Sequence, residues 1–361
     1  MPKQMEEYKA IDNAWLQRPL IISGPCSAET EVQVLATAQQ LAATGQVHVF
    51  RAGIWKPRTR PGMFEGVGKM GLPWLQKAKA LTGLPMAVEV ATAKQVEYAL
   101  QHDIDLLWIG ARTTVNPFSV QEIADALRGL DIPVLIKNPI NPDIELWSGA
   151  VERIARAGIR RYGLVHRGFS SYGNTEFRNA PMWHLAIEMK LRYPNIPMLN
   201  DPSHICGRRD KLHHVMQKAV DLDYDGLMIE SHICPDKAWS DAAQQLTPDA
   251  LMQLMQQIVW RKEHTESPSL HSLLDELRQQ ISQLDDELLE ILSKRMQLVQ
   301  EIGRYKKANN LTILQAGRWA EITEKAIHNG TAKGLSASFI KNFYEAMHIE
   351  SIDQQKKIMD E

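Results

Sequence analysis

The chain has 361 residues, 44% of them hydrophobic and 23% charged, which is the composition of a globular protein with one large domain or two. Its formal net charge of −2 gives no sign of a nucleic-acid or membrane partner. Three cysteines, at positions 26, 206 and 234, are too few for a disulfide framework and favour a reducing compartment. The N-terminal segment lacks the apolar core of a signal peptide, and no stretch approaches the roughly 18 apolar residues that span a membrane. We therefore expect a cytoplasmic protein that acts on small molecules.

Short apolar, β-branched segments recur up to about residue 262, with helical stretches between them. Their nearly continuous apolar character is typical of strands buried on both faces, as in a parallel sheet. Eight strand–helix units within about 240 residues favour a (β/α)8 TIM barrel. The alternative, a doubly wound open sheet, usually has fewer strands and a Gly-rich first turn, where this chain has SGPCSAE. The eight expected strands are 19–25, 47–53, 85–90, 106–111, 133–138, 162–167, 197–201 and 226–231.

The sequence pattern changes after the barrel. Residues 264–269 (HTESPS) are polar and are interpreted as a linker between a barrel at 1–263 and an all-α helical domain at 270–361. About 40 residues from Leu270 onward repeat apolar side chains at the i, i+3, i+4, i+7 spacing of an amphipathic helix. Such a helix is roughly 60 Å long. A domain of this size cannot cover its apolar stripe alone, so we expect a partner chain to do so in a homodimer.

Two shorter helices are expected to follow the long one, near residues 316–329 and 336–358. Together the three helices make the second domain entirely α-helical.

Long cationic side chains fall at the C-terminal ends of the expected strands. These ends meet at one mouth of a barrel, which is the face that carries active sites. A single arginine there is more often a surface cation, but six like charges at one mouth would repel one another unless anions fill the site. Arginine binds carboxylate and phosphate through two parallel hydrogen bonds, so the pattern indicates small anionic substrates. The six are Arg51, Lys56, Arg58, Arg112, Lys137 and Arg167.

A second set at the same mouth consists of Cys26, His204, Glu230 and Asp241. Taken singly, a cysteine or histidine at a strand end is usually a buried structural residue. Together they offer one thiolate, one imidazole and two carboxylates, which suit a borderline divalent metal such as Mn²⁺, Fe²⁺ or Zn²⁺ better than Ca²⁺ or Mg²⁺. A cation there would polarise a carbonyl oxygen.

The motifs around these residues resemble the 3-deoxy-D-arabino-heptulosonate 7-phosphate (DAHP) synthase family over roughly residues 18–250. The resemblance implies a (β/α)8 barrel that condenses phosphoenolpyruvate with erythrose 4-phosphate, releases phosphate and opens the shikimate pathway. A related synthase uses arabinose 5-phosphate, but KPRT argues for the erythrose enzyme. The motifs are GPCS (24–27), FRAGIWKPRT (50–59), IGARTT (109–114), IKN (136–138), HRGF (166–169), DPSH (201–204), IESH (229–232) and SDAAQQL (240–246).

By resemblance, the thiolate, imidazole and carboxylates named above hold the divalent metal, with Mn²⁺ as the first choice and Fe²⁺, Co²⁺ and Zn²⁺ as alternatives. Arg58 and Thr59 would hold erythrose 4-phosphate. The resemblance also implies that five cations hold phosphoenolpyruvate and that one of them, Lys56, is catalytic. The five are Arg51, Lys56, Arg112, Lys137 and Arg167.

Two cations of the long helix, Arg295 and Lys306, are eleven residues apart and so point within about 20° of each other. Spaced along an otherwise apolar face, they could hold a small dianion from both ends. The alternative is that they only snorkel at the edge of the core stripe. Arg278 points about 100° away from Arg295, so it would reach such a cluster only in a partner chain.

LRQQISQLDDELLEILSKR in this region resembles the all-helical chorismate mutase family, an intertwined dimer that rearranges chorismate to prephenate. The resemblance implies that Arg278 crosses the dimer and that Lys306 and Gln355 contact the ether oxygen, while Arg278 and Arg295 bind the carboxylates. The other pocket residue it implies is Arg318. Two departures, Gln315 and Trp319, stand where the family often has acids.

Three interpretations follow for the helical domain: a chorismate mutase, a binding module for chorismate or prephenate that regulates the barrel, or a dimerisation module only. Five polar groups directed at one pocket argue against the last. Only about 18 residues precede the first expected strand, so we expect no N-terminal regulatory domain. Feedback by prephenate, or by a downstream product, would then act through the helical domain.

Overall fold

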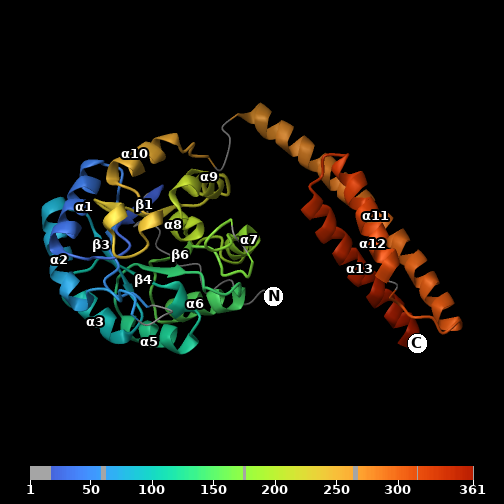
Figure 1. Cartoon of the computed structure of the whole chain (residues 1–361), viewed down its shortest axis with the longest axis horizontal. Coiled ribbons are helices and arrows are strands. Elements are labelled where there is room, and N and C mark those ends of the chain that lie inside the picture. Colours follow the sequence, from blue (N-terminus) through green and yellow to red (C-terminus); the bar gives the residue numbers. More distant parts are fainter. Residues whose placement is uncertain (1–17, 58–61, 174–175, 263–266, 315, 361) are drawn as a thin grey trace. The chain divides into compact units, whose positions relative to one another are not determined.

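The computed structural model describes residues 18–57, 62–173, 176–262, 267–314 and 316–360. The side chains of residues 316 and 318 are outside this description. The chain divides into two compact units, Met1–Glu263 and His264–Glu361 (Figure 1).

The first unit is a closed barrel of eight parallel strands in the order β1 to β8. Figure 1 shows the strands inside a ring of helices. This confirms the predicted fold class, and each strand lies within a segment that the sequence predicted. The strands are β1 (Leu20–Gly24), β2 (Val49–Arg51), β3 (Met86–Val90), β4 (Leu106–Ile109), β5 (Val134–Lys137), β6 (Tyr162–His166), β7 (Met198–Asn200) and β8 (Gly226–Glu230).

Side chains alternate between two apolar layers along each strand, because successive residues of a strand point to opposite faces. On β1, Ile22 points into the barrel, where it packs with Trp108 and Met228. Its neighbour Ile21 points outward into the layer between strands and helices. The barrel is therefore filled by side chains, and only its mouth is open to ligands.

The barrel closes where β8 pairs with β1, with Leu20 opposite Gly226. A Cβ atom at position 226 would lie 2.0 Å from the backbone oxygen of Leu20. Only glycine lets the two strands approach this closely, so this residue fixes the closing seam.

Polar residues start several of the helices around the barrel. Thr30, Thr92, Asn116, Asp143 and Thr247 each accept a hydrogen bond from a backbone N–H of the first helical turn. The α-helices are α1 (Glu31–Ala43), α2 (Leu72–Thr82), α3 (Ala93–Gln101), α4 (Ala111–Thr114), α5 (Pro117–Leu127), α6 (Ile144–Arg156), α7 (Trp183–Arg192), α8 (Pro202–Cys206), α9 (Leu212–Asp221) and α10 (Pro248–Gln257). Short 3₁₀ turns are η1 (Gly68–Gly71), η2 (Arg209–Lys211), η3 (Pro235–Lys237) and η4 (Ala242–Gln244).

The second unit consists of α11 (Pro268–Ala308), α12 (Ala316–Thr331) and α13 (Ala337–Asp360), and α13 packs against both other helices (Figure 1). The 41-residue helix α11 begins at Pro268, with Ser267 as its N-cap. Helix α11 thus begins within the segment 264–269 that is interpreted as a linker, because proline is a favourable first residue of a helix.

The N-terminal half of α11 leaves its apolar stripe exposed in the single chain. The stripe consists of Leu270, Leu273, Leu274, Leu277, Ile281, Leu284, Leu288 and Ile291, each at least 38% exposed. None of the described helices is long and apolar enough to cross a membrane.

Candidate active sites

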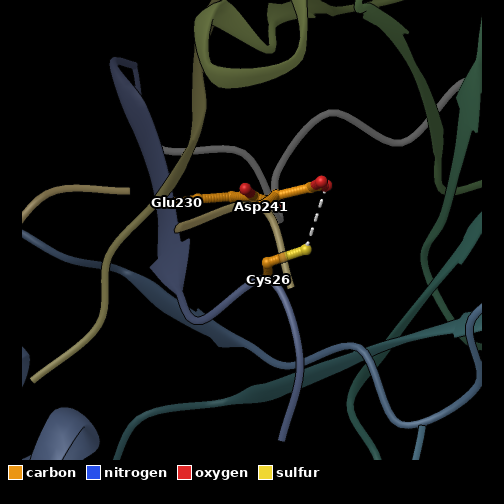
Figure 2. A group of neighbouring side chains, drawn as sticks. All are labelled: Cys26, Glu230 and Asp241. Atoms are coloured by element: carbon orange, nitrogen blue, oxygen red, sulfur yellow. Dashed lines mark hydrogen bonds between the residues drawn. The ribbon is translucent and has the colours of Figure 1, made fainter. Parts of the chain in front are cut away.

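Three side chains from distant parts of the sequence meet at the mouth of the barrel. Cys26 follows β1, Glu230 ends β8, and Asp241 precedes η4, and their ligand atoms all lie within 4.8 Å of one another (Figure 2). The Cys26 Sγ lies 3.4 Å from Asp241 Oδ2. Asp241 has the left-handed backbone angle φ of 48°, which a non-glycine residue adopts at a cost. This arrangement has the donor set of a divalent-metal site.

His204, on helix α8, is the fourth predicted ligand and lies next to this cluster, beside Glu230. Its Nδ1 lies 2.8 Å from Asp201 Oδ2, and its Nε2 lies 3.7 Å from Glu230 Oε1. Burial lowers the pKa of His204, although the charges of Asp201 and Glu230 oppose this shift. A neutral ring that donates from Nδ1 to a carboxylate leaves the lone pair of Nε2 directed at the cluster, as metal-bound histidines do.

The Glu230 carboxylate is fully buried, yet its Oε1 has no hydrogen-bond partner among the described residues. The nearest cation is Arg51, whose Nη2 lies 3.3 Å from that oxygen. A buried carboxylate oxygen without a donor is costly, and a metal ion is one of the few partners that would satisfy it. The residues present therefore fit a divalent metal.

Lys56 lies directly beside the cysteine. Its Nζ is 3.1 Å from Cys26 Sγ and 2.8 Å from the Cys26 carbonyl oxygen. Burial, followed by the charge of Glu230, raises the pKa of the Cys26 thiol to about 12. Burial lowers the pKa of Lys56, but the charge of a Cys26 thiolate, followed by that of Glu230, outweighs burial and raises it. The Lys56 ammonium is therefore the partner of the deprotonated thiol, which is the form in which a cysteine binds a metal.

Two of the residues predicted to bind substrate, Arg51 and Lys137, are buried cations next to the candidate metal ligands. Arg51 is 1% exposed, and its guanidinium lies over the Trp108 ring at 4.8 Å. Its Nε and Nη1 have no hydrogen-bond partner among the described residues. Lys137 pairs with Asp201 at 2.7 Å, and burial lowers the pKa of Lys137. Unused N–H groups on a buried guanidinium are what an anionic substrate would fill.

Arg167 adds a third buried cation. Burial, together with the charges of Arg178 and Arg112, lowers its pKa to about 10, although the charge of Asp201 opposes this shift. Arg112 is exposed and lies near enough to act on Arg167. Arg58 and Thr59, expected to hold the phosphate of the second substrate, lie outside the described residues.

Sequence reasoning missed several residues that hold these groups. Arg178 pairs with Asp241 at 3.0 Å and donates to Gln244 Oε1 at 2.7 Å. Gln244 in turn donates to Glu230 Oε2 at 2.7 Å. Asp201 and Gln244 lie inside the DPSH and SDAAQQL motifs, close to His204 and Asp241 in the sequence. This closeness to two predicted ligands is the signal that could have identified them as supporting residues. Arg178 lies in the β6–α7 loop, and no sequence pattern marked it.

In the helical unit, two predicted pocket residues meet at one serine. Arg295 Nη1 donates to Ser351 Oγ at 2.8 Å, and Gln355 Nε2 donates to the Ser351 carbonyl oxygen at 3.3 Å. Gln355 is 8% exposed, and its Oε1 has no hydrogen-bond partner among the described residues. Gly303 on α11 lies under it, because a Cβ there would be 3.4 Å from Gln355 Cγ.

The other predicted residues of this pocket lie apart from that serine. Lys306 Nζ donates to the Ile313 carbonyl oxygen at 2.6 Å. Arg278 is exposed and pairs with Asp275 at 2.9 Å on its own helix. The side chain of Arg318 is outside the description. Trp319 stacks on His348 with ring centres 3.9 Å apart.

The closed barrel, with buried cations and a metal-ligand set at the C-terminal ends of its strands, defines a barrel enzyme that acts on anionic substrates. Residues 9–267 match the family model "DAHP synthetase I family", and residues 277–356 match "Chorismate mutase type II". The chain belongs to the DAHP synthetase I family and carries a chorismate mutase type II domain behind the barrel. It is thus a bifunctional enzyme: a DAHP synthase that joins phosphoenolpyruvate to erythrose 4-phosphate, and a chorismate mutase that forms prephenate.

Individual relatives agree with this family. A phospho-2-dehydro-3-deoxyheptonate aldolase of Thermotoga maritima is 32% identical over 242 residues, which are 66% of this chain and 68% of that protein. Its crystal structure matches with a TM-score of 0.59 at 30% identity, covering 66% of this chain and 67% of that one. A 2-dehydro-3-deoxyphosphooctonate aldolase of Syntrophotalea carbinolica is 28% identical over 259 residues, and the match covers 66% of this chain and 89% of that protein.

Proposed function

We propose that Cys26, His204, Glu230 and Asp241 hold the divalent metal of the condensation, with Mn²⁺ as the first choice and Fe²⁺, Co²⁺ and Zn²⁺ as alternatives. The donor set supports this, since a thiolate with imidazole and carboxylates selects transition metals over Mg²⁺ and Ca²⁺. When bound, such a metal supplies a Lewis acid for the aldehyde oxygen of erythrose 4-phosphate.

The observation that carries the synthase site is the buried Arg51, whose Nε and Nη1 have no hydrogen-bond partner among the described residues and lie beside this ligand set. Phosphoenolpyruvate carries a carboxylate and a phosphate, and in our proposal these groups are bound by Arg51, Lys56, Arg112, Lys137 and Arg167. The negative charges of the substrate offset the repulsion among these cations, and the cations hold its enol carbon in position.

Cys26→Ala tests the metal site. The variant removes the only sulfur ligand, so it should lose metal affinity and reduce condensation at least a thousandfold. Condensation is measured as phosphate release after chelator treatment and metal titration, with Cys234→Ala as the control because Cys234 is exposed. Full activity of chelator-treated Cys26→Ala protein would refute the site.

Substrate choice at the barrel is tested with two aldoses. Because KPRT (56–59) argues for the erythrose enzyme, erythrose 4-phosphate should react and arabinose 5-phosphate should not. Comparable kcat/KM for the two sugars would show that this motif does not decide the choice.

For the helical unit, we propose that Lys306 and Gln355 contact the ether oxygen of chorismate, while Arg295 and a partner chain's Arg278 bind its carboxylates. Arg318 would line the same pocket. The buried, unpartnered Oε1 of Gln355 supports a polar ligand there. The reaction is unimolecular, so it needs only an electrostatic pocket that stabilises charge on the ether oxygen.

The test is chorismate consumption by the full chain and by Lys306→Ala. Rapid turnover that falls at least a hundredfold in the variant supports these roles. No turnover by the full chain, with measurable prephenate binding, would instead make this unit a binding module for feedback.

We further propose that the protein is a cytoplasmic homodimer formed through α11, with prephenate as a feedback ligand of the barrel. The exposed apolar stripe of α11 supports the homodimer.

A further inference from the structure

The motif SDAAQQL (240–246) supplies one metal-ligand candidate, Asp241, and the support residue Gln244, and it leaves Gln245 without an assigned role. Gln245 is fully buried, and both ends of its amide are used. Its Oε1 accepts a hydrogen bond from the backbone N–H of Cys26 at 2.9 Å. Its Nε2 donates to the Ser240 carbonyl oxygen at 2.8 Å. One side chain therefore links the loop that carries the thiolate to the residue directly before Asp241.

A second link joins the same two loops. The hydroxyls of Ser27 and Ser240 lie 2.5 Å apart, and both residues are buried. Each of these serines is the immediate neighbour of a metal-ligand candidate in the sequence. Next to them, Trp239 N–H donates to Glu29 Oε1 at 2.7 Å, which ties the two loops a third time.

These links matter because the ligands they hold are not fixed by secondary structure. Cys26 lies beyond the end of β1, and Asp241 lies eleven residues beyond the end of β8 in a left-handed conformation with φ of 48°. Glu230, in contrast, belongs to a barrel strand. Arg178 pairs with Asp241, and Lys56 contacts Cys26, but neither cation is hydrogen-bonded to both ligands. The links described above join the two ligand loops to each other.

We propose that Ser27, Ser240 and Gln245 form a clasp that sets the separation of the Cys26 and Asp241 ligand atoms, with Gln245 as its central positioning residue. The proposal rests on the metal site proposed above. Supporting residues of this kind commonly change metal affinity 10- to 100-fold when they are replaced.

Gln245→Met is the direct test, because methionine has similar length and apolar stem but makes neither hydrogen bond. We expect the dissociation constant for Co²⁺ or Mn²⁺, measured on the full chain by competition with a chelator, to rise about 10- to 100-fold. The thiolate-to-Co²⁺ charge-transfer absorption should weaken or shift, since the cysteine would be held less firmly. At saturating metal the kcat should return close to the wild-type value, although the dissociation constant for the metal stays raised.

The matched control is Gln95→Met. Gln95 lies on α3, and its Oε1 accepts a hydrogen bond at 2.7 Å from the backbone N–H of Ala91, directly before that helix; it is not hydrogen-bonded to the ligand candidates. It should keep the wild-type metal dissociation constant. Thermal unfolding of the metal-free proteins distinguishes a general loss of stability from a loss of metal binding. A general loss would lower the melting temperature without changing the metal dissociation constant.

Ser27→Ala decides the matter if Gln245→Met does not fold, since removing one hydroxyl is a small change. It should weaken metal binding several-fold. Folded Gln245→Met and Ser27→Ala proteins with wild-type dissociation constants and a wild-type Co²⁺ spectrum would overturn the clasp. Cys26→Ala in the same titration keeps the two proposals apart: wild-type metal binding by that variant would refute the metal site itself.

Discussion

His166, the last residue of β6, lies fully buried directly before Arg167. Its Nδ1 faces the Tyr224 hydroxyl at 2.9 Å, and its Nε2 faces the Pro181 carbonyl oxygen at 2.6 Å. The carbonyl can only accept, so Nε2 carries the proton and Nδ1 accepts from the tyrosine. Burial lowers the pKa of His166 from 6.5 to about 4. The ring is therefore neutral in the folded protein and charged in the unfolded chain at pH 5.

This shift predicts acid sensitivity of the barrel. Between pH 6.5 and 4 the unfolded state binds more protons at His166 than the folded state, so stability falls as the pH falls. From pH 7 to pH 5 the loss is about 2 kcal/mol for this residue. Urea unfolding of the wild type and of His166→Gln at both pH values measures it. The variant should lose part of the pH dependence, and an unchanged pH dependence in His166→Gln would contradict the assignment.

At the residue scale, the sequence predicted side chains at the ends of strands better than those in long loops. Cys26, Glu230 and Arg51 come from strand ends, which a barrel brings to one mouth whatever the loops do. Arg178 and Gln245 act through loops whose path depends on tertiary packing, and single-sequence patterns do not encode that path. The position of Arg278 in the helical unit is equally hard to predict from one sequence, since the pocket that we propose it enters belongs to a second chain.

At the scale of elements, the seam between β8 and β1 depends on Gly226. Gly226→Ala should destabilise the barrel by about 3 kcal/mol, because the new Cβ meets the backbone oxygen of Leu20 rather than a movable side chain. Denaturant unfolding followed by circular dichroism measures this.

The comparison is Gly149→Ala on α6, where the nearest atom is the flexible Arg153 Nη1 at 3.0 Å. That variant should be neutral or more stable by up to about 1 kcal/mol, since alanine favours the helix. Equal stability of the two variants would show that the seam has room for a methyl group.

Helix α11 gives the second prediction at this scale. Leu284, 62% exposed in the single chain, lies on the apolar stripe. Leu284→Glu would lose about 2 kcal/mol of apolar burial in each of two chains, which weakens a dimer roughly a thousandfold. Sedimentation velocity should show monomers, and mutase activity should fall because Arg278 would have no partner pocket.

Gln279→Glu adds the same charge on the opposite face of α11 and serves as the control. It should sediment as the wild type does. A Leu284→Glu protein that still forms dimers would exclude this stripe as the interface.

The strands and helices were the most predictable part of the fold. Strands buried on both faces are nearly continuous apolar segments, and all eight stood out. The start of α11 was less clear, because Ser267 and Pro268 favour both a linker and the beginning of a helix.

For the whole molecule, the division between residues 263 and 264 allows a test of feedback. Prephenate should inhibit condensation by the full chain and leave a chain of residues 1–263 unaffected, because the proposed binding site lies in the helical unit. Initial rates of phosphate release with and without prephenate measure this. Equal rates for the full chain in both conditions would refute the proposed feedback.

The buried guanidinium of Arg51 also has a consequence for how long the enzyme survives. Two of its nitrogens, Nε and Nη1, and one oxygen of Glu230 lack hydrogen-bond partners among the described residues, so the protein alone leaves polar groups unsatisfied at the centre of the barrel. Substrate and metal that bind only the folded state would stabilise it by about 2.7 kcal/mol at a hundred times their dissociation constants. Proteases that cleave the transiently opened protein would then remove it fastest in cells starved of phosphoenolpyruvate or metal, so its abundance would follow the supply of its own ligands.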